Sequence, residues 1–157
     1  MAKTEKTDKT DKTVVFSDEE RAAMKAASAE RRTARSRAKK DPAEVRREGE
    51  AEVREKLAAM PDDDRALGEA LHAMVAEAAP HLVPRTYYGM PAYANEAGKV
   101  VCFYKPRSKF KVRYSTFEFD QAANLDEGTV WPTAYAVTAL GDEQLAFLAE
   151  RVRRAAS

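Results

Sequence analysis

The sequence predicts an α+β two-layer sandwich, with an antiparallel sheet of about four strands covered by helices on one face and an N-terminal helical extension. Three observations predict this class. An apolar stripe at helical spacing lies within 62–79, short extended segments joined by turn residues fill 85–139, and a second amphipathic stripe follows Asp142. Short links between successive strands favour antiparallel pairing, so the two amphipathic helices would cover one face of the sheet.

Composition limits the possible functions. The chain has 157 residues, of which 44% are hydrophobic, enough for one domain with a core. Its formal net charge of +1 gives the whole molecule no strong attraction to nucleic acid or to an anionic membrane. The single cysteine, Cys102, excludes an internal disulfide, and no segment has the apolar run of a signal peptide or membrane span. These features predict a cytoplasmic protein with no membrane partner.

Three regions follow one another along the chain. Residues 1–16 are predicted to form a disordered tail, because their Lys-Thr-Glu/Asp triplets offer almost no apolar surface. Residues 17–60 predict a helical arm, in which Ser17 caps one helix and Asp41 the next. The second helix has a narrow apolar seam of Val45, Gly49, Val53 and Leu57. Residues 61–157 then form the core domain.

The core domain is predicted to contain a helix, four strands and a helix. Asp62 or Asp63 is expected to cap the first helix, which ends before Pro80. The expected strands are 85–94, with a break at Gly89 to Pro91, then 99–105, 110–115 and 133–139. The third would place Phe110, Val112 and Tyr114 on one face, and the final helix begins at Asp142.

Enzyme signatures are absent from the pattern. Neither His72 nor His81 is placed by the sequence beside Cys102 or any serine, so no nucleophile and base can be paired. Cys102 lies in an apolar strand and is interpreted as a small buried hydrophobe rather than a reactive thiolate. No phosphate-binding glycine loop or metal motif occurs. The sequence therefore favours a non-catalytic protein.

The stretch Tyr87-Tyr88-Gly89-Met90-Pro91-Ala92-Tyr93 has two interpretations. Gly89 and Pro91 interrupt the strand, and the tyrosines could fill the gap between sheet and helices, which is the interpretation we favour. Alternatively, the bend could open a small aromatic ligand cleft. The residues of that cleft would be Tyr87, Tyr88, Met90, Tyr93 and Trp131.

Basic side chains occupy every second position of the central hairpin. They are Lys105, Arg107, Lys109, Lys111 and Arg113. Cations interleaved with aromatic residues are the combination used for phosphate contact and base stacking, so this ridge is a candidate anion or nucleic-acid site. The alternative, which we favour, is a solvated sheet face with a polar turn.

Carboxylates gather between the last two predicted strands. They are Glu118, Asp120, Asp126 and Glu127. Oxygen-rich loops can bind hard cations, but the spacing matches no calcium loop, and a solvated acidic loop is favoured.

Four segments in order resemble the YdhG-like domains, a family of unknown function. They are Tyr88-Gly89-Met90-Pro91-Ala92-Tyr93, Gly98-Lys99-Val100-Val101-Cys102-Phe103, Ala122-Ala123-Asn124-Leu125-Asp126 and Trp131-Pro132-Thr133-Ala134. The resemblance covers roughly 61–155 and implies a frataxin-like fold. Since one branch of the family is regarded as an iron chaperone for iron-sulfur and haem assembly, it also implies ferrous iron as a ligand.

This chain departs from frataxin-like iron binding, which relies on acidic residues of a helix and the adjacent sheet edge. Its predicted sheet carries lysine and arginine instead, so only Asp62, Asp63, Asp64 and the acidic loop could supply oxygens. We therefore expect a non-catalytic YdhG-like binding module for a small ligand or metal ion. The alternative is a nucleic-acid-associated accessory protein that uses the basic ridge.

Overall fold

The computed structural model describes residues 15–157, so the predicted tail lies outside the described residues except for its last two positions. Five antiparallel strands form one open sheet in the order β1-β2-β3-β4-β5. The strands are β1 (Val83–Tyr87), β2 (Met90–Ala94), β3 (Val100–Lys105), β4 (Ser115–Phe119) and β5 (Ala134–Val137). Each strand pairs with its neighbour in sequence, as short connections predict.

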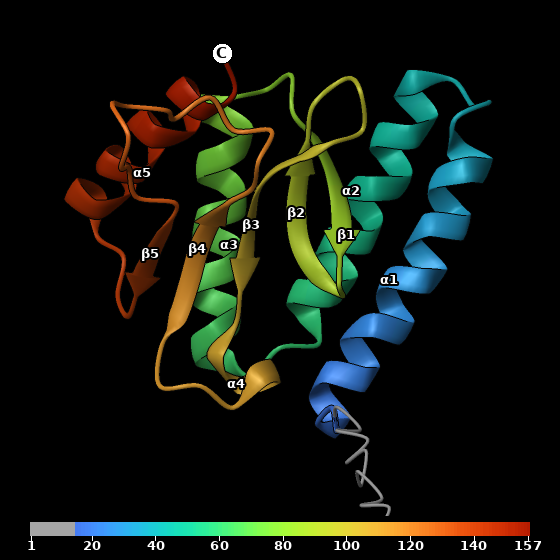
Figure 1. The fold of residues 1–157 in the computed structure, drawn as a ribbon, viewed down its shortest axis with the longest axis horizontal. Helices are drawn as coiled ribbons and strands as arrows, with labels where there is room; N and C mark the ends of the chain where they lie inside the picture. The colour runs from blue at the N-terminus through green and yellow to red at the C-terminus, as the bar shows by residue number, and fades with distance from the viewer. Residues whose placement is uncertain (1–14) are drawn as a thin grey trace, which may run out of the picture.

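Four of the five helices in the described residues lie where the sequence predicts them, and the short fourth helix was not predicted. They are α1 (Asp18–Arg37), α2 (Pro42–Ala58), α3 (Asp62–Ala78), a short α4 (Arg107–Phe110) and α5 (Asp142–Ala155) (Figure 1). The Ser17 hydroxyl accepts the Glu20 amide at 3.1 Å, and the Asp41 carboxylate accepts the Ala43 amide at 3.2 Å. The predicted N-caps of α1 and α2 are therefore confirmed. The predicted cap of α3 is wrong, because Pro61 precedes the helix and Asp62 is already its first residue.

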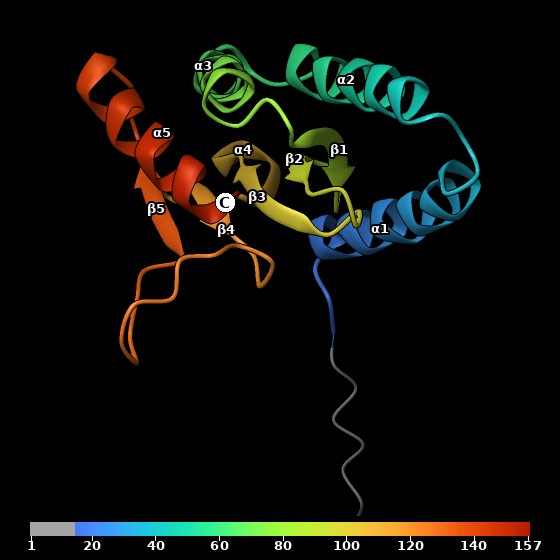
Figure 2. The same ribbon diagram turned by 90° about the horizontal axis from the view of Figure 1, so that it is seen from above.

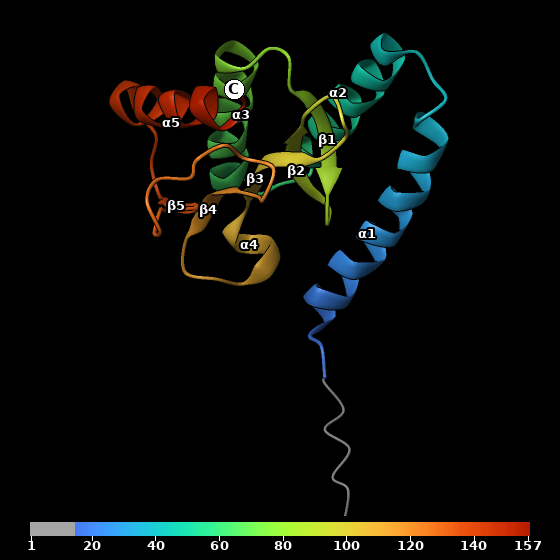
Figure 3. The same cartoon turned by 45° about the horizontal axis from the view of Figure 1, so that its top comes forward.

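Helices lie on both sides of the sheet. Figure 2 shows α2, α3 and α5 on one side, and α1 on the other side beside the β1–β2 end. Helices α1 and α2 run in opposite directions (Figure 3), and Figure 2 shows β1 between them. The predicted α+β class is confirmed, with one strand more than expected.

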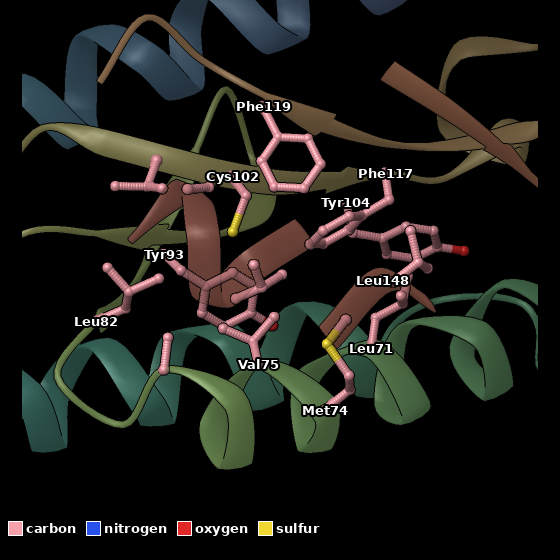
Figure 4. Close-up of a cluster of buried hydrophobic side chains, with 14 of the residues drawn as sticks. Leu71, Met74, Val75, Leu82, Tyr93, Cys102, Tyr104, Phe117, Phe119 and Leu148 are labelled. Carbon is pink, nitrogen blue, oxygen red and sulfur yellow. The ribbon is translucent and has the colours of Figure 1, made fainter. Parts of the chain in front are cut away.

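The main core lies between the sheet and helices α3 and α5. In Figure 4, Leu71, Met74 and Val75 point from α3 toward aromatic side chains of the sheet. Those aromatic residues include Tyr93, Tyr104, Phe117 and Phe119. Leu148 and Val152 of α5 complete this layer. The apolar stripes predicted for the two core helices are thus the faces that they bury.

Helix α2 packs directly on β1. Val53 is 0% exposed and Leu57 is 3% exposed. Gly49 makes the closest approach, since a Cβ built there would lie 1.9 Å from the Pro84 carbonyl oxygen. The missing side chain at Gly49 therefore lets α2 cover the sheet edge, although its apolar seam is narrow.

The segment predicted as one bent strand, 85–94, is instead a hairpin. Tyr88 and Gly89 form its two-residue turn, with φ angles of 51° and 75°. Positive φ at both central residues is what a type I′ turn requires. The Gly-Met-Pro element therefore closes β1 onto β2, and this is why the sheet has five strands rather than four.

The predicted strand 110–115 is wrong. Pro106 ends β3, the chain turns through α4, and Lys111 takes the left-handed conformation with φ of 52°. The Ser115 hydroxyl accepts the Arg107 amide at 2.9 Å, and the Asp64 carboxylate accepts the Ser108 amide at 3.1 Å. These bonds satisfy helix-start amides and favour a turn over an extended strand.

Candidate ligand cleft

A cleft of about 910 Å³ lies between α1, α2, β1 and the loop that joins β2 to β3. Its wall on α1 is made of small side chains, and β1 and α2 add further apolar residues. The apolar lining includes Ala26, Ala29, Ala34, Ala38, Val45, Val83 and Pro84. The polar lining includes Glu30, Thr33, Arg37, Lys40, Glu52, Lys56, Arg85, Thr86 and the loop residues 95–98.

The sequence of α1 explains why this space exists. The side chains that α1 presents to the cleft include Ala26, Ala29, Ala34 and Ala38, which are too short to fill the distance between a helix and a sheet edge. Larger residues at these positions would close the gap by direct packing. The alanine-rich face instead leaves the cleft open.

Glu30 attaches α1 to the tip of the β1–β2 hairpin. Its carboxylate accepts the Tyr88 amide at 2.8 Å and the Gly89 amide at 2.9 Å. The Lys109 ammonium donates to the Tyr88 carbonyl at 2.9 Å from the α4 side. Burial, followed by the positive charge of Lys56, lowers the pKa of Lys109. One end of the cleft is therefore closed by polar contacts rather than by apolar packing.

Ion pairs join α1 to α2 at the other end of α1. Arg37 contacts Glu48 at 3.0 Å and Glu52 at 2.5 Å, and Lys40 contacts Glu48 at 2.6 Å. Glu52 also accepts from the Thr86 hydroxyl of β1 at 3.5 Å. The acid and base side chains here satisfy one another across the helix hairpin.

Unlike Arg37 and Lys40, the cations Arg85 and Lys56 of the cleft form no ion pair within the described residues. The Arg85 Nε donates to the Thr86 carbonyl at 3.1 Å, and Nη1 donates to the Gly98 carbonyl at 3.2 Å. Within residues 15–157, neither Arg85 nor Lys56 has a carboxylate within ion-pair distance. Neither of these two cations is therefore neutralised by an ion pair in the part of the chain that the structure describes.

The predicted aromatic cleft is not formed, because the sheet separates its residues. Tyr87, Tyr88 and Met90 pack with Phe103 on the face away from α3. The rings of Tyr87 and Tyr88 are 4.7 Å apart, and those of Tyr87 and Phe103 are 5.4 Å apart. Burial and the neighbouring Asp120 raise the pKa of Tyr87 to about 12. These aromatic side chains form packing clusters, which agrees with the structural interpretation.

Tyr93 and Trp131 belong to the main core on the opposite face. The Tyr93 hydroxyl lies 2.9 Å from His72 Nδ1, and His72 Nε2 lies 2.8 Å from the Glu50 carboxylate. With Nε2 donating to the acid, Nδ1 forms the hydrogen bond with the Tyr93 hydroxyl. This buried chain of hydrogen bonds joins α2, α3 and β2. The sequence does not predict this network, because its members come from three separate segments.

Burial and neighbouring charges shift the pKa of Glu50 in opposite directions. Burial raises the pKa of its carboxyl, but the hydrogen bond and charge of His72, with Arg54 beside it, outweigh burial and lower that pKa from its ordinary value of 4.5. Burial raises the pKa of the Tyr93 hydroxyl well above its ordinary value. The network therefore holds an ionised acid and a neutral phenol.

The five basic residues do not form one ridge. Lys105 lies over the Phe110 ring at 5.1 Å, Arg107 faces Asp63 at 3.7 Å, and Arg113 lies over Tyr114 at 4.8 Å. Lys109 binds the hairpin tip, and Lys111 pairs with Glu19 of α1. Since 110–115 is not a strand, the every-second-residue spacing does not place these side chains on one face. Most of them hold α4 and α1 in position.

The carboxylates of the first core helix have separate partners. Asp62 pairs with Arg65 at 2.7 Å, and Asp63 faces Arg107. Asp64 is only 1% exposed and accepts from Ser108 and Ser115. Asp64 therefore fastens α3 to α4 and β4.

The acids of the predicted acidic loop are also dispersed. Glu118 accepts from Thr116 at 2.6 Å, and Glu127 pairs with Arg154 at 3.4 Å. Asp120 lies near Tyr87, and Asp126 is exposed on the loop before β5. Across the described part of the chain, no group of three or more His, Cys, Asp or Glu side chains is arranged to hold a metal ion. The predicted metal ligands are thus not brought together.

No family model, curated protein or solved structure matches this chain. The resemblance to YdhG-like domains therefore stays a prediction. No helix in the described residues is long and apolar enough to cross a membrane.

Three polar residues of the cleft, Glu30, Lys56 and Arg85, were not predicted as site residues from the sequence. One signal could have indicated Glu30. It follows Ala23 and Ala27 at helical spacing, which places a carboxylate on the buried face of α1. A charged residue on such a face needs a partner from another element. The partner here is a pair of backbone amides, which no residue pattern encodes.

Proposed function

We propose that this protein is a non-catalytic binding module that takes up a small organic molecule in the cleft between α1, α2 and β1. The observation that carries the proposal is the cleft itself. Its volume of about 910 Å³ falls in the range of roughly 300–1,000 Å³ that is typical of small-molecule sites. Its wall is mainly apolar, with a few polar groups at fixed positions, and such a lining suits a small organic ligand.

The nucleophile and base candidates support binding rather than catalysis. Cys102 is fully buried in the main core, and burial raises the pKa of its thiol. Both ring nitrogens of His72 are engaged by Tyr93 and Glu50. Neither side chain lines the cleft. A ligand in the cleft would therefore not contact them.

The other expected functions have less support. Ferrous iron rests on the resemblance to YdhG-like domains, whereas the candidate carboxylates lie apart and have partners of their own. A nucleic-acid role rests on the basic residues 105–113, most of which contact the protein's own side chains and carbonyls. The protein is proposed to be cytoplasmic, as its composition predicts.

A fragment screen followed by protein-observed NMR tests the proposal. We expect saturable shifts of the amides of α1 and β1 that line the cleft. The variant Ala34→Trp should block binding by filling the cleft, whereas Ala22→Trp, which lies on the exposed side of α1, should bind normally. Circular dichroism of both variants checks that the helices remain folded. Absence of saturable binding, or binding that Ala34→Trp leaves unchanged, would overturn the proposal.

A further inference from the structure

We infer that the cleft selects an organic anion, a molecule with one anionic group on an apolar body. This inference rests on the proposed function, since it names the chemical class of ligand for the same site. The preference for an anion depends on which charged groups of the cleft already have ion pairs or hydrogen bonds within the protein.

The acids of the cleft are mostly occupied. Glu30 accepts two backbone amides at 2.8 and 2.9 Å. Glu52 is paired with Arg37 and also accepts from Thr86. The third acid, Glu96, is exposed on the loop between β2 and β3, where water screens its charge. The interior of the cleft therefore offers few free acceptors to a cationic ligand.

The cations of the cleft fall into two pairs. Arg37 and Lys40 are neutralised by Glu48 and Glu52. Arg85 and Lys56 have no carboxylate partner among residues 15–157. Glu30 and Glu96 also lack an ion pair within these residues, but both oxygens of Glu30 are engaged by amides, and Glu96 and Lys56 are exposed to water. Arg85 is therefore the partly buried cation of the cleft that keeps donors for a ligand, and an anion bound to it would gain charge-charge attraction that a neutral molecule of the same shape would not.

Arg85 is the better placed of these two cations. Its side chain is partly buried, and the Thr86 and Gly98 carbonyls hold its Nε and Nη1. No protein group in the described residues accepts from Nη2, which keeps two N–H donors for a ligand. A guanidinium held in this way is suited to a carboxylate or similar oxyanion, because its donors are already oriented.

Lys56 stands toward the opposite end of the cleft. Helix α2 follows β1, since Gly49 contacts Pro84 and Glu52 contacts Thr86, so Lys56 lies one turn further toward the hairpin tip. Lys109, which binds that tip, has its pKa lowered by burial and then by the charge of Lys56. The alanines of α1 line the space between the two ends. An anionic group at Arg85 would therefore leave an apolar body against the alanine wall.

The alternative is that Arg85 only anchors the loop between β2 and β3. A library of matched pairs separates the two roles, each pair consisting of an aryl-alkyl carboxylate and its neutral primary amide. We expect the carboxylate of a pair to bind about tenfold more tightly than the amide in the native protein. Arg85→Gln should reduce carboxylate affinity to that of the amide, while the amide still binds. Arg47→Gln, which removes an exposed charge of α2 outside the cleft, should leave the preference unchanged.

The outcomes distinguish the inference from the proposed function. If carboxylates and amides shift the same cleft amides with equal affinity, the anion preference is wrong while small-molecule binding stands. A preference that survives Arg85→Gln would likewise overturn the inference and leave small-molecule binding standing. If no member of the library binds, both are overturned. Loosening of the loop in Arg85→Gln would lower the affinity for both members of a pair, whereas loss of the charge would lower only the affinity for the carboxylate. A thermal melt of Arg85→Gln shows whether the variant has lost stability.

Discussion

The carboxylate of Glu30 accepts the backbone amide of Gly89 at 2.9 Å, so an acid from the first helix is bound at the turn of the first hairpin. The two residues are separated by 59 positions in the chain. Because α1 buries mainly alanine, this contact supplies a large part of the specific attachment of α1 to the sheet. The cleft depends on that attachment, since α1 forms one of its walls.

Replacing Glu30 by glutamine should loosen α1. A carboxamide has one acceptor oxygen where the carboxylate uses two, so one of the Tyr88 and Gly89 amides would face an NH₂ group. We expect the free energy of local opening of α1 to fall by about 1–2 kcal/mol. Hydrogen exchange of α1 peptides measures this, with Glu55→Gln on the exposed side of α2 as the control. Unchanged hydrogen exchange in Glu30→Gln would show that the hydrogen bonds from Tyr88 and Gly89 to Glu30 do not hold α1 in place.

Gly49→Ala should destabilise the protein although it improves helix propensity. In an unobstructed helix, the change from glycine to alanine stabilises by about 1 kcal/mol. Here the added Cβ would lie 1.9 Å from the Pro84 carbonyl oxygen, which is backbone and cannot rotate away. We expect a net loss of about 1–2 kcal/mol in the free energy of unfolding, measured by urea denaturation. A variant as stable as the native protein would mean that α2 does not pack this closely on β1.

Asp64→Ala should be far more damaging than Asp63→Ala. The buried Asp64 carboxylate accepts the Ser108 amide and the Ser115 hydroxyl, whereas the Asp63 side chain is 87% exposed. Loss of a charged acceptor from buried donors should cost about 2–3 kcal/mol, against less than about 0.5 kcal/mol at the exposed site. Thermal unfolding of the two variants provides the comparison. Equal effects would contradict the anchoring role of Asp64.

Glu50 should make stability depend on acid pH. Its folded pKa lies below the ordinary value of 4.5, so the unfolded chain takes up a proton at a higher pH than the folded protein. The stabilisation is therefore present above about pH 4.5 and is lost as the pH falls through the folded pKa. Native protein and Glu50→Gln should converge in stability as the pH is lowered from neutral through this range, as followed by urea denaturation. A difference that does not change with pH would contradict an ionised Glu50 beside His72.

Much of the fold is determined locally by the sequence. Ser17 and Asp41 start their helices because each side chain satisfies an amide of its own first turn. The stripe of Leu71, Met74 and Val75 predicts the buried face of α3, because helical spacing puts these residues on one side. Such features need only neighbours within a few residues, so they can be inferred without the tertiary structure.

Segments whose conformation depends on distant partners could not be inferred in this way. Alternation of apolar and polar residues favoured a strand at 110–115, but Asp64, which lies 44 positions before Ser108, supplies an acceptor that favours a helical turn there instead. Likewise, Gly89 was recognised as a break, while its place in a two-residue turn depends on the pairing of Tyr87 with Met90.

The candidate site belongs almost entirely to the tertiary structure. The sequence by itself determined the class of fold, the positions of α1, α2, α3 and α5, and the burial of Cys102, all of which follow from local sequence patterns. Only the tertiary structure decided that the tyrosines lie on opposite faces of the sheet and that the cleft lies between α1, α2 and β1. The physical reason is that a cleft is space left between elements, and its charge depends on which acids are already bound by amides and cations far away in the chain.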